Sequence, residues 1–198
     1  LGSNMHDYDY VGVGRDDGDR KGEYCAIFFN EKKYKLLKNS TFWLSESPNE
    51  VSIGWDAALE RICTYALLET IREENKIWVF NTHFDHIGNI AREESARLLL
   101  EKIKMLNTRE DPVLVMGDFN ALEKSMVIDI LRQSLADTMK GTDVEHKGPV
   151  GTFNNFLKNQ QIIKRIDYIF SKGFQTISHQ HVDKKLDNGN HISDHLPV

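Results

Sequence analysis

Hydrophobic and polar residues follow two different periods along the chain, and these periods predict its strands and helices. Residues 61–71 and 76–84 are rich in β-branched and aromatic residues and flank the polar residues 72–75. This strand–turn–strand pattern predicts that at least part of the sheet is antiparallel. Residues 90–106 place apolar side chains at spacings of three and four, with charges on the other face, which predicts an amphipathic helix.

Shorter apolar runs complete the predicted set of elements. The pattern predicts a strand in residues 23–30, with Ala26 to Phe29 buried, and a partner strand in residues 34–44 after a Glu-Lys-Lys turn. The pattern also predicts a buried strand at 113–116 and a second helix at 125–135. A polar loop region is expected at 137–159, followed by strands at 165–170 and 174–182. The expected class is α/β with mixed, partly antiparallel sheets and few helices.

Length and charge restrict the kind of protein. The chain has 198 residues, and residues 1–198 are most simply a single domain with a sizeable core. A net charge of −5 argues against a general binder of nucleic acids or membrane surfaces, so contact with phosphate is expected from a local site. No apolar run reaches about 18 residues, so no transmembrane segment is expected. Cys25 and Cys63 lie in strand-like segments and are expected to be buried free thiols.

Four segments share one arrangement, in which an apolar strand ends in Asp, Asn or His. The clearest is residues 113–120, where Asp118 and Asn120 follow the buried strand and would point to the same side in extended backbone. This arrangement places a carboxylate and a carboxamide where open α/β sheets bind ligands. For this segment alone, an Asx-rich turn is an equally good interpretation.

The other three segments add two histidines and a second carboxylate, because they end at His83, Asp167 and His195. Either histidine alone would usually be structural. Asp167, however, lies between strand-forming apolar residues, where a carboxylate is costly to bury unless it is paired. His195 is available as its partner, and a carboxylate that orients an imidazole is the usual way to make a general base. We therefore predict a His195–Asp167 dyad.

The motifs around these residues resemble those of the endonuclease/exonuclease/phosphatase superfamily of DNase I-like enzymes. They are Thr82-His83, Gly117-Asp118-Phe119-Asn120, Arg165-Ile166-Asp167 and Ser193-Asp194-His195, in the order of that superfamily. Residues 8–80 also resemble a bacterial branch with Gly-Arg-Asp-Asp-Gly and Gly-Trp-Asp-Ala segments. The resemblance implies an α/β (α+β) fold, a two-sheet mixed β-sandwich flanked by helices, and phosphoester hydrolysis with Mg²⁺ or Mn²⁺ as the cofactor.

The resemblance also implies a role for each matching residue. His195 would be the general base that activates water, with Asp167 orienting it. Asp118 would position the nucleophile or assist the leaving group, Asn120 would contact the phosphate, and His83 would hydrogen-bond a phosphoryl oxygen.

Two carboxylates and one arginine complete the expected site. Asp194 and Asp118 would lie on the metal side, since oxygen ligands suit a hard divalent ion. The substrate contacts would be Arg61, Asn120 and His83, although Arg61 could equally be an ordinary surface arginine.

Family members begin with a strand that carries Asn and a segment that ends in Gln-Glu, whose glutamate is a principal metal ligand. Neither motif precedes Asp7 here. On domain-size grounds the chain starts roughly 40 to 60 residues late, so we expect a partial domain with poor metal affinity. A leader missing from the same end would make the protein secreted or periplasmic.

Three functions compete at this point. The first is a metal-dependent phosphoester hydrolase, a monoesterase or a diesterase, whose substrate is a small molecule, a nucleic acid or a lipid head group. The negative charge disfavours a stable nucleic-acid complex and favours a small soluble phosphoester. The alternative is a catalytically inactive member acting as a binding or scaffold domain, which the intact motifs argue against. A serine hydrolase would need a Gly-x-Ser-x-Gly elbow, which the chain lacks.

Two further groups of residues have plain interpretations. Residues 15–20 are most simply a solvated loop. His179 and His181 share one strand face and resemble a metal-binding pair. No third ligand lies near them in the sequence, so we do not expect a zinc site there.

Overall fold

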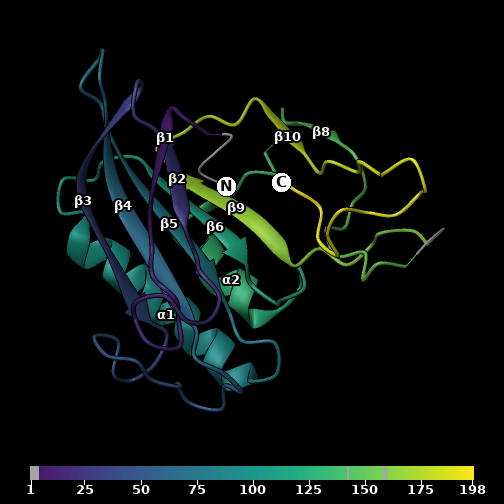
Figure 1. The fold of residues 1–198 in the computed structure, drawn as a ribbon, viewed down its shortest axis with the longest axis horizontal. Coiled ribbons are helices and arrows are strands. Elements are labelled where there is room, and N and C mark those ends of the chain that lie inside the picture. Colours follow the sequence, from purple (N-terminus) through teal and green to yellow (C-terminus); the bar gives the residue numbers. More distant parts are fainter. Residues whose placement is uncertain (1–4, 142, 158–159) are drawn as a thin grey trace.

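A mixed six-stranded β-sheet lies at the centre of the computed structural model, which describes residues 5–141, 143–157 and 160–198 (Figure 1). Its strands, in spatial order, are β3 (Tyr34–Trp43), β4 (Ile62–Thr70), β5 (Lys76–His83), β6 (Val113–Asp118), β9 (Asp167–Lys172) and β7 (Ala136–Asp137). Neighbouring strands are antiparallel except β5 and β6, which are parallel. The sheet is therefore mixed, as the sequence predicts.

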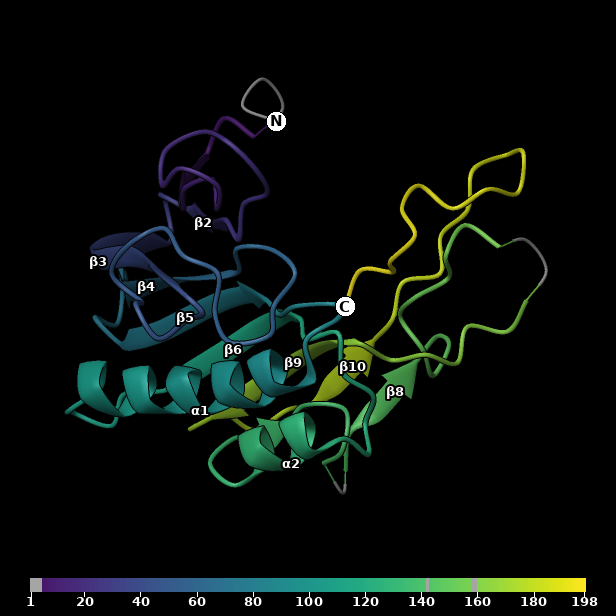
Figure 2. The ribbon, with the colours of Figure 1, turned by 90° about the horizontal axis from the view of Figure 1, so that it is seen from below.

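Two helices cover one face of this sheet (Figure 2). The crossover between the parallel strands β5 and β6 contains α1 (Asn89–Leu106), and α2 (Met126–Arg132) follows β6. Strand residues such as Phe80 and Val115 pack with Leu99 of α1 in the main hydrophobic core. Both helices were expected, but α2 is shorter than predicted because the backbone after Arg132 tightens into turns with i→i−3 hydrogen bonds.

A small second sheet covers part of the opposite face (Figure 2). It consists of β1 (Tyr8–Val11) and β2 (Ile27–Asn30), which pair antiparallel. Phe29 of this sheet packs in a second core cluster with Leu68 and Val79 of the central sheet. At another edge of the molecule, β8 (Glu145–Lys147) and β10 (Ser178–Gln180) form a parallel pair. The layers are thus helices, central sheet and a smaller sheet.

Two details of the predicted strands are wrong. The strand at residues 23–30 was expected to pair with residues 34–44, but β2 pairs with β1 and β3 pairs with β4. Ala26 to Phe29 were expected to be buried together, yet Phe28 is 41% exposed. The reason is that β2 presents only one face to the core, so only alternate side chains are covered.

The C-terminal third of the chain has less regular structure than predicted. The strand expected at 174–182 is reduced to β10, and the expected polar loop at 137–159 contains β8. Cys25 and Cys63 are buried free thiols, as predicted. Across the described residues, no helix has the length and hydrophobicity to cross a membrane.

Candidate active site

The ends of three neighbouring strands place three polar side chains in one row. His83 ends β5 and is the register partner of Asp118, which ends β6. Asp118 is in turn the register partner of Asp167, the first residue of β9. Because side chains alternate along a strand, this row points to the face that carries Val79 and Met116, opposite to the helices.

A glycine makes this row possible. Gly117 precedes Asp118 and has φ of +141°, a backbone conformation that L side chains rarely adopt. A Cβ atom at this position would lie 1.8 Å from the Thr82 carbonyl oxygen of β5. The close approach of β5 and β6 at the site therefore requires glycine at position 117.

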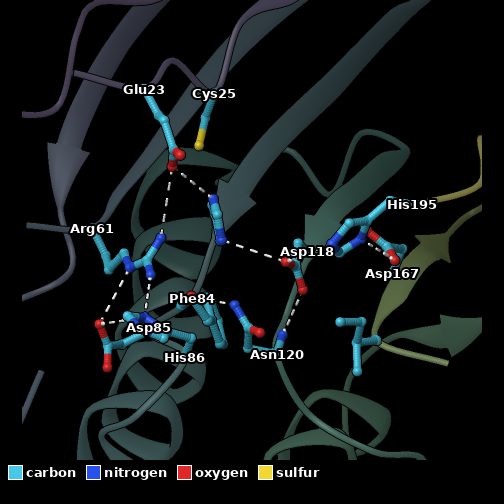
Figure 3. Close-up of polar contacts among 12 residues, drawn as sticks. Glu23, Cys25, Arg61, Phe84, Asp85, His86, Asp118, Asn120, Asp167 and His195 are labelled. Carbon is cyan, nitrogen blue, oxygen red and sulfur yellow. Dashed lines mark hydrogen bonds and ion pairs between the residues drawn. The ribbon is translucent and has the colours of Figure 1, made fainter. Parts of the chain in front are cut away.

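His195 reaches the row from the C-terminal segment and contacts Asp167 (Figure 3). Its Nδ1 lies 2.8 Å and 3.0 Å from the two Asp167 carboxylate oxygens, so Nδ1–H donates to the carboxylate. This hydrogen bond raises the pKa of His195 above 6.5. The Phe153 ring packs edge-on against the imidazole, with centroids 5.0 Å apart. In its neutral form His195 therefore presents the Nε2 lone pair, which lies 4.0 Å from Asp118 Oδ2.

Asp118 is a partly buried carboxylate with few compensating charges. Burial, together with the charge of Asp167, raises the pKa of Asp118 to about 6. Asp118 Oδ1 accepts a hydrogen bond of 2.8 Å from the Asn120 backbone N–H, and Oδ2 lies 3.4 Å from His83 Nε2. Burial and the nearby charges of Arg61 and Arg15 lower the pKa of His83 to about 3, so this imidazole is neutral.

Asn120 reaches the site by a route that differs from the predicted one. The strand ends at Asp118, and Asn120 has φ of +46°, in the left-handed region, instead of extended backbone. Its amide nitrogen donates a 3.0 Å hydrogen bond to the Phe84 carbonyl oxygen, which holds the side chain beside Asp118. Both residues still line the same cleft.

Arg61 lies on the other side of the site from His195 (Figure 3) and is buried, with 4% of its side chain exposed. The interpretation of Arg61 as a surface arginine is therefore wrong. Its Nε donates to Asp85 Oδ2 at 3.3 Å, and its Nη2 lies 2.9 Å from His86 Nδ1. The remaining nitrogen, Nη1, is buried and has no hydrogen-bond partner among the described residues, although Glu23 Oε2 lies 3.9 Å from it. The guanidinium is thus held rigidly, and Nη1 is left without a hydrogen bond.

The sequence missed an ion pair of this site, Arg15 with Glu23. Glu23 Oε2 accepts a hydrogen bond from Arg15 Nη1 at 2.5 Å, and it lies 3.3 Å from His83 Nδ1. Residues 15–20 were expected to be a solvated loop, which is wrong for Arg15, whose side chain is 12% exposed. A bridge between Gly14 and Tyr24 closes the loop and brings its two ends together. The Gly-Arg-Asp-Asp-Gly resemblance was the available signal for Arg15.

These residues surround a cleft of about 420 Å³. Its lining consists of Arg15, Glu23, Leu59, Arg61, His83, His86, Asp118, Asn120, Asp194 and His195. Asp167 lies behind His195 and does not line it. Asp118, Asp167 and His195 have ligand atoms within 4.8 Å of one another and form a candidate metal group, whereas the predicted ligand Asp194 lies outside that group but in the cleft wall.

The sequence model of the endonuclease/exonuclease/phosphatase family matches residues 6–195. The chain belongs to this family. The predicted resemblance is confirmed, and the four motifs that suggested it all contribute residues to the cleft or to the dyad behind it.

Several solved structures and one curated sequence are similar to this chain over most of its length. A mannosyl-6-phosphatase from Bacteroides thetaiotaomicron is 35% identical, with 98% of this chain and 76% of that chain covered and a TM-score of 0.92. An uncharacterized protein from Acanthamoeba polyphaga mimivirus is 29% identical over 209 residues, covering 98% of this chain and 76% of the relative. The human Nocturnin catalytic domain, 18% identical with a TM-score of 0.71 and coverage of 98% and 71%, shares the fold. The DNase I-like fold class is thereby confirmed.

Proposed function

We propose that the protein is a divalent-metal-dependent phosphoester hydrolase in which His195 is the general base. The observation that carries this proposal is the contact of His195 Nδ1 with both oxygens of Asp167, which leaves Nε2 facing the cleft. The carboxylate fixes the tautomer and stabilises the imidazolium that forms when Nε2 takes a proton from water. Membership of a family of nucleases and phosphatases makes a phosphoester the natural substrate.

The cleft residues fit a hard divalent cation. Asp118 is partly buried, and its ion-pair contacts within 4.0 Å in the described parts of the chain are histidines, not lysine or arginine. A carboxylate whose charge is not balanced by lysine or arginine suits Mg²⁺ or Mn²⁺, which prefer oxygen ligands. We propose that Asp118 and Asp194 hold the ion. When bound, it supplies neutralisation of charge on the phosphoryl oxygens.

The other cleft residues would bind and orient the phosphoryl group. Neutral His83 donates a hydrogen bond to a phosphoryl oxygen as negative charge builds there. Nη1 of Arg61, which makes no hydrogen bond within the described chain and lies 3.9 Å from Glu23 Oε2, is a second donor, and Asp85 and His86 fix the guanidinium in place. Asn120 contributes its amide group. Arg61 lies across the site from His195 (Figure 3), so these donors would hold the phosphorus between Arg61 and the attacking water.

A small phosphomonoester is the substrate class that we favour. A cleft of about 420 Å³ fits a small ligand, and its lining is mostly charged or polar. A net charge of −5 opposes tracking along a nucleic-acid backbone, so no stable nucleic-acid complex is expected. The mannosyl-6-phosphatase relative at 35% identity supports a sugar phosphate. A catalytically inactive scaffold is the alternative, and the four motifs found between residues 82 and 195 argue against it, because their residues lie in the cleft or in the dyad.

The test is phosphate release from mannose 6-phosphate, p-nitrophenyl phosphate and bis-p-nitrophenyl phosphate, each with Mg²⁺, with Mn²⁺ and with EDTA. We expect turnover of the monoesters that needs the metal and exceeds turnover of the diester. Faster hydrolysis of the diester would contradict the monoesterase assignment while keeping the chemistry. The absence of turnover for every ester with either metal would favour the scaffold alternative.

A further inference from the structure

Three histidines lie together outside the catalytic cleft. His146 of β8 is the register partner of His179 of β10, and His181 follows β10 directly. The ring centroids of His179 and His181 are 5.0 Å apart, and that of His146 lies 5.6 Å and 4.9 Å from them. The third ligand that the sequence lacked near His179 and His181 is thus supplied by a strand more than thirty residues earlier.

Hydrogen bonds fix which nitrogen of His179 and His181 carries the proton. The Thr138 hydroxyl donates to the Ile169 carbonyl oxygen at 2.8 Å, so it can only accept from His179 Nδ1, 3.0 Å away. His181 Nδ1 lies 2.7 Å from the Pro149 carbonyl oxygen, which also can only accept. Both neutral imidazoles therefore carry their proton on Nδ1 and a lone pair on Nε2.

These two lone pairs face each other. His179 Nε2 and His181 Nε2 are 3.1 Å apart, a hydrogen-bond distance with no proton left to share. Both rings are buried, so water does not separate the two lone pairs. A cation between the nitrogens satisfies both lone pairs. Two nitrogens bound tetrahedrally to one zinc at ~2.05 Å would be about 3.3 Å apart, close to the observed separation.

A hydrogen bond also fixes the protonated nitrogen of His146, which therefore offers a third lone pair. Its Nε2 lies 3.1 Å from the Pro149 carbonyl oxygen and must donate to it, which leaves the lone pair on Nδ1. That Nδ1 atom is buried and has no hydrogen-bond partner among the residues that the structure describes. In the described chain, only Asp118, Asp167 and His195 have ligand atoms that all lie within 4.8 Å of one another. The three histidine nitrogens are therefore farther apart than this, and the His146 ring must turn toward the other two rings when an ion binds.

We propose that His146, His179 and His181 form a zinc site. In His179 and His181 the Nδ1–H already donates to a hydroxyl or a backbone carbonyl, the arrangement that orients metal-binding histidines. Neutral imidazoles suit Zn²⁺ and not Mg²⁺, so this site and the oxygen-rich cleft would select different ions.

The zinc site would support the catalytic dyad from a distance. It would join β8 to β10 around Pro149, and the chain continues from Pro149 to Thr152. The Thr152 hydroxyl accepts hydrogen bonds of 3.1 Å from the backbone N–H groups of Ile166 and Asp167. Zinc would therefore stabilise the segment on which the Asp167 backbone rests, without contributing to the cleft.

The experiment is equilibrium dialysis against Zn²⁺ in excess Mg²⁺, which would fill the cleft under the proposed function, followed by measurement of bound zinc per chain. The variants are His146→Asn and His181→Asn, and His191→Asn is the matched control, because His191 is buried and paired with Asp183 outside the cluster. We expect one zinc in the wild type and the control, and at least a tenfold loss of affinity in both cluster variants.

Thermal unfolding separates loss of the site from loss of the fold. With EDTA, His146→Asn should unfold at the temperature of the wild type, because His146 is partly exposed. Added Zn²⁺ should raise the unfolding temperature of the wild type and the control only. Zinc uptake by His146→Asn equal to that of the wild type, or no uptake by the wild type, would overturn the proposal.

Discussion

The chemistry of the cleft depends on how single side chains change one another. Asp167 accepts from His195 Nδ1 with both oxygens, so the histidine is oriented and its pKa is raised. Across the row, His83 stays neutral between two carboxylates, with Nε2 3.4 Å from Asp118 and Nδ1 3.3 Å from Glu23. Two imidazoles in one cleft are thus prepared for different tasks, one to accept a proton and one to donate a hydrogen bond.

Replacing Asp167→Asn should shift the pH dependence of the reaction. A general base must be deprotonated, so wild-type kcat/KM should fall as the pH drops through the pKa of His195, which lies above 6.5. Without the carboxylate, that pKa falls, and the acid limb should move to lower pH while the plateau rate drops about 10²-fold or more. The measurement is kcat/KM against pH for both proteins. Superimposable profiles would show that Asp167 does not act through His195.

The sequence predicted most residues of the cleft and of the dyad, and it missed Glu23 and Arg15, which lie at the two ends of one loop. His83, Asp118 and Asp167 could be found because each ends or begins a strand in an apolar context. Glu23 could not, because its position depends on how the loop of residues 14–24 closes, which no periodicity encodes. Arg61 was found only through the family resemblance, since an arginine before a strand carries no pattern of its own.

At the scale of elements, the site is a consequence of strand register. A shift of β6 by one residue would move Asp118 to the helix side of the sheet and would separate it from His83 and Asp167. The close approach of β5 and β6 at Gly117 fixes this register. The position is therefore both structural and functional.

Replacing Gly117→Ala should destabilise the protein and reduce turnover. The new Cβ would lie 1.8 Å from the Thr82 carbonyl oxygen, so β5 and β6 must separate where His83 and Asp118 meet. Gly189→Ala is the matched control, because Gly189 also has positive φ, +79°, but no atom of the described chain lies within 4 Å of its Cβ position. We expect a loss of about 2 kcal/mol or more in the free energy of unfolding beyond that of the control. Equal losses in urea unfolding would contradict this account.

Pairing partners were harder to predict than the elements themselves. Both helices and the long strands of the central sheet were predicted from local periodicity. That β2 pairs with β1 instead of β3 depends on which layer each strand joins. The short turn at residues 31–33 leads from the small sheet to the central sheet, and a three-residue turn alone is equally compatible with a hairpin.

At the scale of the whole molecule, a buried charge network ties the catalytic motif to the rest of the fold. Arg165, two residues before the dyad carboxylate, donates to Asp137 at 2.9 Å and 2.6 Å, and Arg132 of α2 donates to it at 2.7 Å. The side chains of Asp137 and Arg165 are 1% and 3% exposed. The arginine of the Arg-Ile-Asp motif thus supports the structure and does not reach the cleft.

Replacing Asp137→Asn should cost about 3–5 kcal/mol in the free energy of unfolding, because it leaves buried Arg165 without its counter-charge. Burial alone would raise the pKa of Asp137, but the hydrogen bonds from Arg165 and Arg132 lower it below 3.8. The wild-type advantage should therefore be complete above pH 3.8 and should shrink as the pH falls through the lowered pKa. Urea unfolding of both proteins from pH 7 to pH 3 measures this difference, and a constant difference would contradict the assignment.

The most direct test of the account is metal-dependent phosphoester turnover by the wild type and by His195→Ala. His6→Ala serves as the control, since His6 is an exposed histidine outside the cleft. With Mg²⁺, loss of the general base should lower kcat by roughly 10²- to 10⁴-fold, while the control keeps wild-type activity and EDTA removes it. A His195→Ala protein that hydrolyses the same ester at the wild-type rate would contradict the central claim.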